Sequence, residues 1–197
     1  LDAMPVHLVN WQGNTIFERG VTWDAFETAG NFAWEDRSID NDALKQAATA
    51  CSTTFNPEQH TDFSYTSEIN LNARYFVRTI ADVLQCGAAI LIDYGFGHDE
   101  YYHPQRSQGT LMCHYRHHSH DDPFYLPGLQ DITAHVNFSE INRIAKENKL
   151  ELMGFTTQAH FLIGGGLQQL SENFDISDSV KMAELSRQIK MLTLPDE

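Results

Sequence analysis

Short runs of β-favouring apolar residues, separated by turn residues, open the chain. Residues 5–9 and 15–21 predict two strands around the turn Gln12-Gly13-Asn14, and residues 30–35 predict a turn that leads into a further strand. The first part of the chain is therefore expected to consist of short strands.

Apolar residues at helical spacing predict helices in the rest of the chain, most of them with a capping residue at the start. A polar loop is expected from Phe55 to Tyr65, between the first two helices. The expected helices run from Asp40/Asn41 to about Cys51, from Ser67 to about Gln85 with Gly87 after its end, from Asn137 or Ser139 to about Asn148, from Gln158 to Leu170 around the glycines 164–166, and from Ser177/Asp178 to Met191.

A continuous apolar run at 88–92, followed by Asp93-Tyr94-Gly95, predicts a strand that is buried on both faces and therefore lies in a parallel sheet. Residues 150–156 predict another strand, and shorter β signals occur at 110–115 and 132–136. The predicted fold class is α/β, with a helix, a buried strand, an inserted segment, and then helix, strand and helix.

The composition is that of an ordinary folded domain. Apolar residues make up 42% of the 197 residues and charged residues 20%, which excludes a disordered, collagen-like or coiled-coil protein. The net charge of −14 argues against nucleic acid as a partner, because a phosphate backbone needs a basic face. It favours a basic or cationic substrate instead.

Cysteine usage and hydropathy bear on location. Cys51, Cys86 and Cys113 are odd in number, widely spaced, and include no CxxC pair. This pattern is typical of a reducing compartment rather than of a disulfide framework. The apolar runs are too short to span a bilayer. We therefore expect a cytoplasmic protein with no membrane partner.

Asp93 is the first polar residue after the predicted buried strand. In open α/β sheets, ligands bind beyond the carboxyl ends of the strands, so Asp93 is expected to point into a crevice. Gly95 and Gly97 would let the backbone approach a ligand closely. The alternative is that Asp93 only caps the turn between strand and loop.

A His-rich segment follows, with six of the ten histidines between His98 and His120. His120 and His135 could act as general bases, because imidazole titrates near neutral pH. His135 could equally be the exposed face of a strand. Ligand types for a transition metal are present at His114, His117, His118, His120, Asp121 and Asp122, but their spacing matches no known zinc motif, so an ordinary hydrogen-bonding loop is favoured.

Two further features complete the candidate chemistry. Arg106 offers a planar donor fork for a carboxylate, although a surface salt bridge would use it equally well. The sequence contains no GxGxxG, GxxxxGK(S/T) or GxSxG motif. The residues alone therefore predict an α/β domain with a polar, His-rich insertion beside a strand-end crevice.

Several motifs nevertheless resemble one known family, in the same order along the chain. The run Leu1–His7 is similar to the part that follows Asn-Glu in the Asn-Glu-x-x-Asp-Ala-x-Pro-Val signature of MidA-type S-adenosylmethionine-dependent methyltransferases. The other matching motifs are Ser67–Asn70, Ile92–Gly95, Tyr101–Arg106, Gly109–Leu111, His120, Pro127-Gly128, Gln130–Val136 and Gly154–Ala159.

The resemblance implies a C-terminal part of a class I, Rossmann-like methyltransferase sheet with a β-rich insertion. Residues 1–95 would form the second half of the core, residues 96–137 a substrate-side insertion, and residues 138–197 a helix-strand-helix part. Family members are roughly twice as long. Their glycine-rich cofactor loop has no counterpart here, so this piece alone is expected to be inactive.

The cofactor implied is S-adenosyl-L-methionine, and the family includes arginine methyltransferases linked to complex I assembly. A protein substrate, with arginine as one possible acceptor, follows from this resemblance. Two alternatives stay open, a non-catalytic binding or assembly module and a metal-dependent hydrolase. The implied catalytic residues are Asp2, Asp93, His120 and His135, and the implied substrate-binding residues are Tyr94, His103, Arg106 and Asp131.

Overall fold

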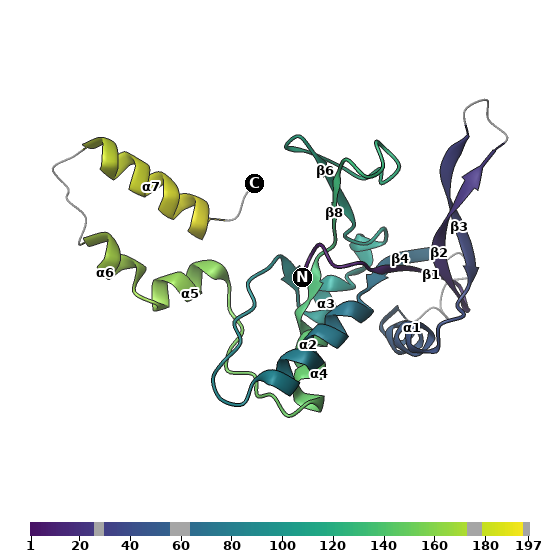
Figure 1. Cartoon of the computed structure of the whole chain (residues 1–197), viewed down its shortest axis with the longest axis horizontal. Coiled ribbons are helices and arrows are strands. Elements are labelled where there is room, and N and C mark those ends of the chain that lie inside the picture. Colours follow the sequence, from purple (N-terminus) through teal and green to yellow (C-terminus); the bar gives the residue numbers. More distant parts are fainter. Residues whose placement is uncertain (26–29, 56–63, 173–178, 195–197) are drawn as a thin grey trace. The chain divides into compact units, whose positions relative to one another are not determined.

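The computed structural model describes residues 1–25, 30–55, 64–172 and 179–194. The chain divides into two units, Leu1–Glu151 and Leu152–Glu197 (Figure 1). Both helices and strands are present, as the α/β prediction requires. None of the described helices combines the length and hydrophobicity that crossing a membrane requires.

An antiparallel sheet forms from the N-terminal strands in the order β3-β2-β1-β4. Strands β1 (His7–Gln12) and β2 (Thr15–Asp24) pair through a turn at Gly13, where φ is +53°. Strand β3 (Asn31–Ser38) extends the sheet beside β2. The predicted hairpin and the strand after it are confirmed.

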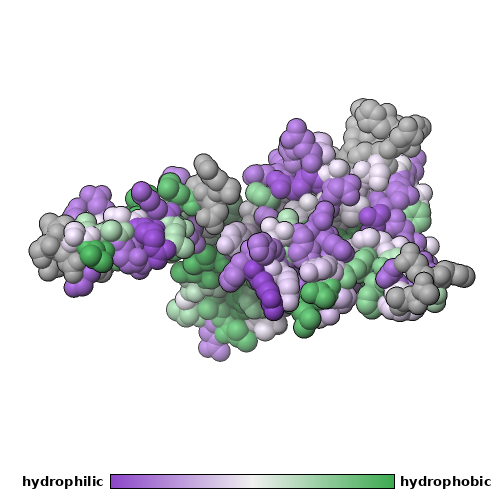
Figure 2. Space-filling model, turned by 90° about the horizontal axis from the view of Figure 1, so that it is seen from above, coloured by the Kyte–Doolittle hydropathy of each residue, from purple (hydrophilic) through white to green (hydrophobic). Residues whose placement is uncertain are grey.

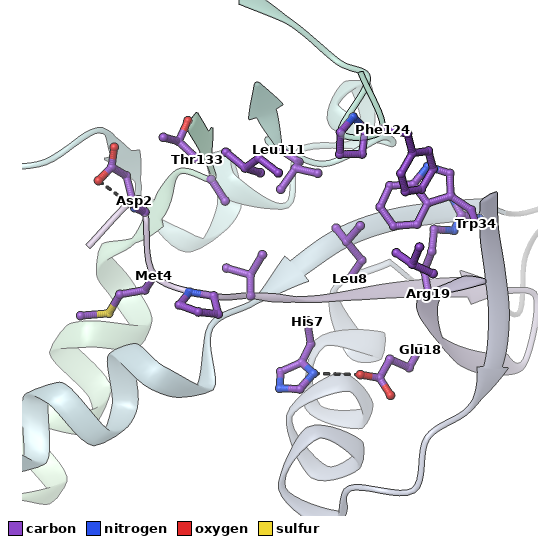
Figure 3. A pocket seen from close by; sticks show the side chains of 17 residues that line it. Asp2, Met4, His7, Leu8, Glu18, Arg19, Trp34, Leu111, Phe124 and Thr133 are labelled. Carbon is purple, nitrogen blue, oxygen red and sulfur yellow. Dashed lines mark hydrogen bonds and ion pairs between the residues drawn. The ribbon is translucent and has the colours of Figure 1, made fainter. Parts of the chain in front are cut away.

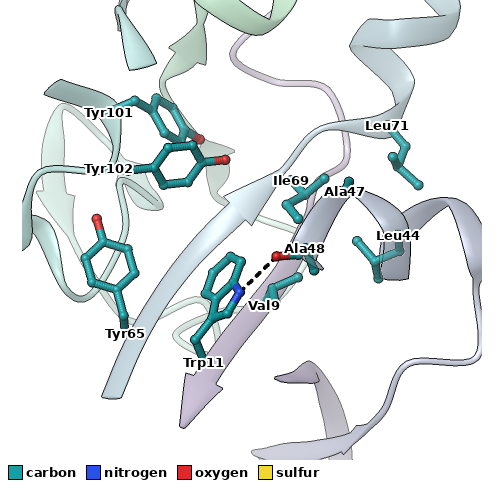
Figure 4. Close-up of a cluster of buried hydrophobic side chains, with 10 residues drawn as sticks. All are labelled: Val9, Trp11, Leu44, Ala47, Ala48, Tyr65, Ile69, Leu71, Tyr101 and Tyr102. Atoms are coloured by element: carbon teal, nitrogen blue, oxygen red, sulfur yellow. Dashed lines mark hydrogen bonds between the residues drawn. The ribbon is translucent and has the colours of Figure 1, made fainter. Parts of the chain in front are cut away.

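Helix α1 (Asp42–Phe55) packs on this sheet, and Asn41 begins it as predicted by accepting hydrogen bonds from two backbone amides. Trp11 donates its indole hydrogen to the carbonyl of Ala48 over 3.1 Å (Figure 4). Full burial of each large apolar side chain contributes about 1.5–3 kcal/mol. Trp11 and Ala48 belong to a cluster of buried hydrophobic side chains that comprises Val9, Trp11, Leu44, Ala47, Ala48, Tyr65, Ile69, Leu71, Tyr101 and Tyr102.

Residues 64–69 form strand β4 (Ser64–Ile69), paired with β1, so the prediction that Ser67 starts a helix was wrong. Helix α2 (Leu71–Val83) begins at Asn70, whose side chain accepts from the amide of Ala73. The strand is polar in sequence but buried in the fold, because pairing with β1 and side-chain hydrogen bonds outweigh local preference. The polar loop predicted from Phe55 to Tyr65 also overlaps this strand, because the strand's own residues are polar. The part of that predicted loop at 56–63 lies outside the described residues.

Helix α4 (Phe138–Glu147) lies against α2, and Asn137 caps it as predicted. The Glu140 carboxylate joins the two helices, at 2.6 Å from the Arg74 guanidinium and 2.7 Å from that of Arg143. Burial alone would raise the pKa of Glu140, but the hydrogen bonds and charges of the two arginines lower it below 4.5. The buried apolar cluster between these two helices and strand β9 (Val136–Asn137) comprises Ala73, Val77, Val136, Ile141 and Ile144.

The free energy of unfolding of the variant Glu140→Gln is expected to be about 1 kcal/mol lower than that of the original chain at pH 7. A carboxylate with a lowered pKa stabilises the fold above its unfolded pKa, and this contribution is lost as the pH falls through the folded pKa. The difference between the two proteins should therefore shrink as the pH falls below 4.5. Urea unfolding from pH 7 to 3 measures it, and a constant difference would contradict the ion-pair account.

Residues 88–94 do not form the predicted buried strand. Ile90 and Ile92 are each 66% exposed. In the part of the chain that the structure describes, parallel pairing is limited to β5 (Gly95–Phe96) with β9 (Val136–Asn137), next to which the carbonyl of Tyr94 accepts from the amide of Val136. A strand buried on both faces needs neighbours on either side, and within the described residues no strand pairs with 88–93.

The predicted strand at 150–156 is also absent, and its Met153 and Phe155 are 84% and 64% exposed. The space-filling view shows apolar residues collected on parts of the surface (Figure 2). Exposed apolar area on this scale is typical of surfaces that contact another chain segment or protein.

The inserted segment begins with α3 (His98–Tyr101) and the 3-10 turn η2 (Pro104–Arg106). Strands β6 (Met112–Tyr115), β7 (His118–His120) and β8 (Asp131–Thr133) then form an antiparallel sheet in the order β7-β6-β8. The short strands predicted in this segment are thus observed.

The second unit contains helices α5 (Gln158–Gly164), α6 (Leu167–Glu172) and α7 (Ser179–Thr193). The chain turns between α5 and α6 at Gly165 and Gly166, as the glycine run predicts. The predicted caps Ser177 and Asp178 lie outside the described residues.

Candidate functional site

A groove of about 490 Å³ lies in the first unit, between the N-terminal sheet and the inserted segment (Figure 3). Residues 2–8 run along it. Leu8, Arg19 and Trp34 lie on the sheet side, and Leu111, Phe124 and Thr133 on the side of the insertion. A groove of this volume is in the range of protein ligand sites.

Asp2 lies at one end of this groove, directly beside Asp93. The Asp93 carboxylate accepts from the amide of Asp2 over 3.1 Å. Its other oxygen accepts from the amide of Tyr94. The structure therefore brings two predicted catalytic residues together, with Asp93 positioning the backbone of Asp2.

Ion pairs on both faces of the sheet flank the groove. Asp36 binds Arg19 through two hydrogen bonds of 2.9 and 3.2 Å, and these lower the pKa of Asp36 below 3.8. Burial alone would raise the pKa of Glu18, but the hydrogen bond from His7 and the charge of Arg37 lower it. Figure 3 shows His7 and Glu18 on the opposite side of β1 from Leu8.

Glu68 is a buried carboxylate that sequence reasoning did not select, although it belongs to the Ser67–Asn70 motif of the family resemblance. Its Oε1 accepts from the amides of Thr110 and Leu111 over 2.8 and 2.9 Å. Its Oε2 accepts from the hydroxyls of Thr110 and Tyr101 over 3.1 and 3.3 Å. Glu68 thus fixes the start of the segment that carries the groove's second wall.

The hydroxyl of Thr110 extends this network by accepting from the amide of His135 over 3.0 Å. The His135 ring stacks on Phe96, with 4.9 Å between centroids, and the guanidinium of Arg106 lies 4.2 Å from the same Phe96 ring. Burial, and then the charge of Arg106, lower the pKa of His135.

The other predicted site residues are placed apart from the groove lining. His103 accepts from the amide of Gln105, and both line a small second hollow with Arg106. His120 contacts Tyr125 edge to face, and its Nδ1 accepts from the amide of Asp122. Tyr94 is 73% exposed, and Asp131 is exposed on β8. Their roles in binding or catalysis stay predictions.

Metal chemistry gains no support from the His-rich segment. Within the ranges that the structure describes, no three or more His, Cys, Asp or Glu side chains gather in a way that could hold an ion. His114, His117 and His118 lie on or beside a hairpin turn, where Arg116 and His117 take positive φ angles.

Solved structures similar to the chain come from Burkholderia thailandensis. One is a "likely methyl transferase" bound to S-adenosyl-homocysteine, with 42% identity and a TM-score of 0.85 over 98% of this chain and 47% of its own. The other is a native structure of an uncharacterised protein of the same superfamily, with 42% identity and a TM-score of 0.85 over 97% of this chain and 48% of its own. The chain thus spans about half the length of these relatives.

A family model described as "Putative S-adenosyl-L-methionine-dependent methyltransferase" matches residues 1–156. No curated protein matches the chain. The match covers the groove, the Asp2–Asp93 contact and the inserted segment. The chain therefore belongs to this methyltransferase family.

Proposed function

We propose that this chain is the C-terminal, acceptor-side half of an S-adenosylmethionine-dependent methyltransferase of the MidA type. The observation that carries the proposal is the groove, which ends at Asp2 beside Asp93, in a chain whose solved relative holds S-adenosyl-homocysteine.

The residues present fit the acceptor side of such a site better than a cofactor pocket. The Asp93 carboxylate accepts from the backbone amides of Asp2 and Tyr94, one on each oxygen, which favours a positioning role over the binding of ribose hydroxyls. The chain also has no GxGxxG loop. We therefore place the cofactor pocket in the other half and expect this chain alone to be inactive.

When bound, S-adenosylmethionine supplies the methyl group, and the protein must hold the acceptor in line with it. The proposed acceptor is an arginine side chain of a protein. The Asp2 carboxylate, 32% exposed at the groove end, would bind its cationic group and orient it. His135, joined through Thr110 to Glu68, would lie on the acceptor side, where its imidazole would take up a proton. The proposed location is the cytoplasm.

Calorimetry with S-adenosyl-homocysteine tests this assignment. We expect saturable micromolar binding by a protein of the full length of the solved relatives and no measurable binding by this chain. Binding by this chain alone would contradict the placement of the cofactor pocket. Lack of binding by the longer protein would contradict methyl transfer and favour a non-catalytic assembly module.

A further inference from the structure

The groove has two unlike ends. Asp2 and Met4 lie at one end, and Trp34 and Phe124 at the other (Figure 3). The rings of Trp34 and Phe124 lie 4.9 Å apart. Phe32 continues this aromatic surface, with its ring 6.2 Å from that of Phe124. A ligand along the groove would therefore meet a carboxylate at one end and aromatic side chains at the other.

Exposure of the aromatic end indicates that it can receive a ligand. Trp34 is 40% exposed and Phe32 44%, so both rings offer apolar surface to a ligand. Aromatic residues of this kind supply much of the affinity in protein interfaces. The groove floor, from residue 2 to residue 8, is at most roughly 20 Å long. An extended peptide of about six residues would cover that distance.

The charges around the groove are mainly acidic. Asp121 and Asp122 are exposed next to Phe124, and Asp122 accepts from the amide of Phe124 over 2.9 Å. Asp2 adds a carboxylate at the other end. Among the described lining residues, Arg19 is paired with Asp36 and His7 with Glu18. Within the described residues, the groove therefore complements a basic ligand.

We propose that the groove binds an extended, basic segment of a protein, with a basic side chain at the Asp2 end and an apolar or aromatic side chain against Trp34 and Phe124. The inference rests on the proposed function, because the Asp2 end is where the acceptor would meet the cofactor. It adds a docking site for the acceptor at a distance from the reacting atoms.

The test is fluorescence anisotropy with the present chain and a labelled peptide in which one arginine and one tryptophan are separated by about four glycine or serine residues. Phe124→Ser and Trp34→Ser are each expected to weaken binding about tenfold, because an aromatic anchor is lost. Asp121→Lys should weaken it about threefold at low salt and less at high salt. Tyr75→Ser, at an exposed aromatic residue of α2 outside the groove, is the matched control and should bind as the original chain does.

Equal affinity of the original chain, Phe124→Ser and Trp34→Ser would overturn the proposal, as would no binding of the peptide. Because the assay contains no cofactor, it is independent of the calorimetry. Peptide binding in the groove would support the docking site even if the longer protein failed to bind S-adenosyl-homocysteine. Cofactor binding without peptide binding would remove the docking site and leave methyl transfer standing.

Discussion

Replacement of Gly109 by alanine is expected to lower the free energy of unfolding by about 3 kcal/mol. A Cβ atom at this position would collide with Oε1 of Glu68. The residue also has φ of +79°, which side chains rarely adopt. Either Glu68 must leave its buried position or the turn before Thr110 must move. Thermal unfolding should show a melting temperature lower by roughly 6–12 °C.

Gly128→Ala provides the matched control. Gly128 has a similar φ of +84°, but nothing lies within 4 Å of the position of its added Cβ. This variant is expected to lose only about 1 kcal/mol from backbone strain. The difference between the two variants isolates the collision with Glu68. Equal losses would show that backbone strain alone explains the effect, and the role given to Glu68 would then be wrong.

Elements with local signals could be predicted well from the sequence. The turn at Gly13 and the caps Asn41 and Asn137 depend on residues next to them in the chain, and the structure confirms all three. Strand β4 depends instead on pairing with β1, more than fifty residues away. Its sequence Ser-Tyr-Thr-Ser-Glu-Ile has no simple alternation, so local reasoning assigned a loop and a helix cap.

The apolar run 88–92 shows the opposite error. Its residues have the composition of an inner strand, but composition cannot supply the neighbouring strands that would bury them. Ile90 and Ile92 are consequently exposed. Whether an apolar run forms an inner strand depends on the presence of strands on both sides of it. In the described residues, the parallel sheet nearby is limited to the short pairing of β5 with β9.

The candidate site was predictable only in part. Asp2 and Asp93 came from the family resemblance and from their place after a strand-like run, and they do lie together. The groove itself could not be predicted, because its walls come from β1–β3 and from residues 111–134. Glu68 was missed because a glutamate in a polar stretch is normally exposed. The signal in the sequence that could have revealed Glu68 was Gly109, because the absence of a side chain there leaves room for the Glu68 carboxylate.

Removal of the Glu68 carboxyl group is expected to have the other large effect on stability. Glu68→Ala would leave the buried amide of Thr110 and the partly buried amide of Leu111 without an acceptor, at a total loss of roughly 3–5 kcal/mol. Glu68→Gln should lose only about 1–2 kcal/mol, because the amide oxygen can still accept from both amides. Its NH₂ group would face the hydroxyls of Thr110 and Tyr101, and a hydroxyl can turn to accept.

Hydrogen exchange separates this account from a general loss of packing. The amides of Thr110 and Leu111 should remain protected in Glu68→Gln and exchange much faster in Glu68→Ala, while Glu151→Gln, at an exposed position, should change neither exchange nor stability. Equal losses in the two Glu68 variants would mean that the negative charge or Oε2, rather than the acceptance of the two amides by Oε1, stabilises the turn. If the account holds, faster exchange should extend to the amide of His135, because the Thr110 hydroxyl that it donates to is itself held by Glu68.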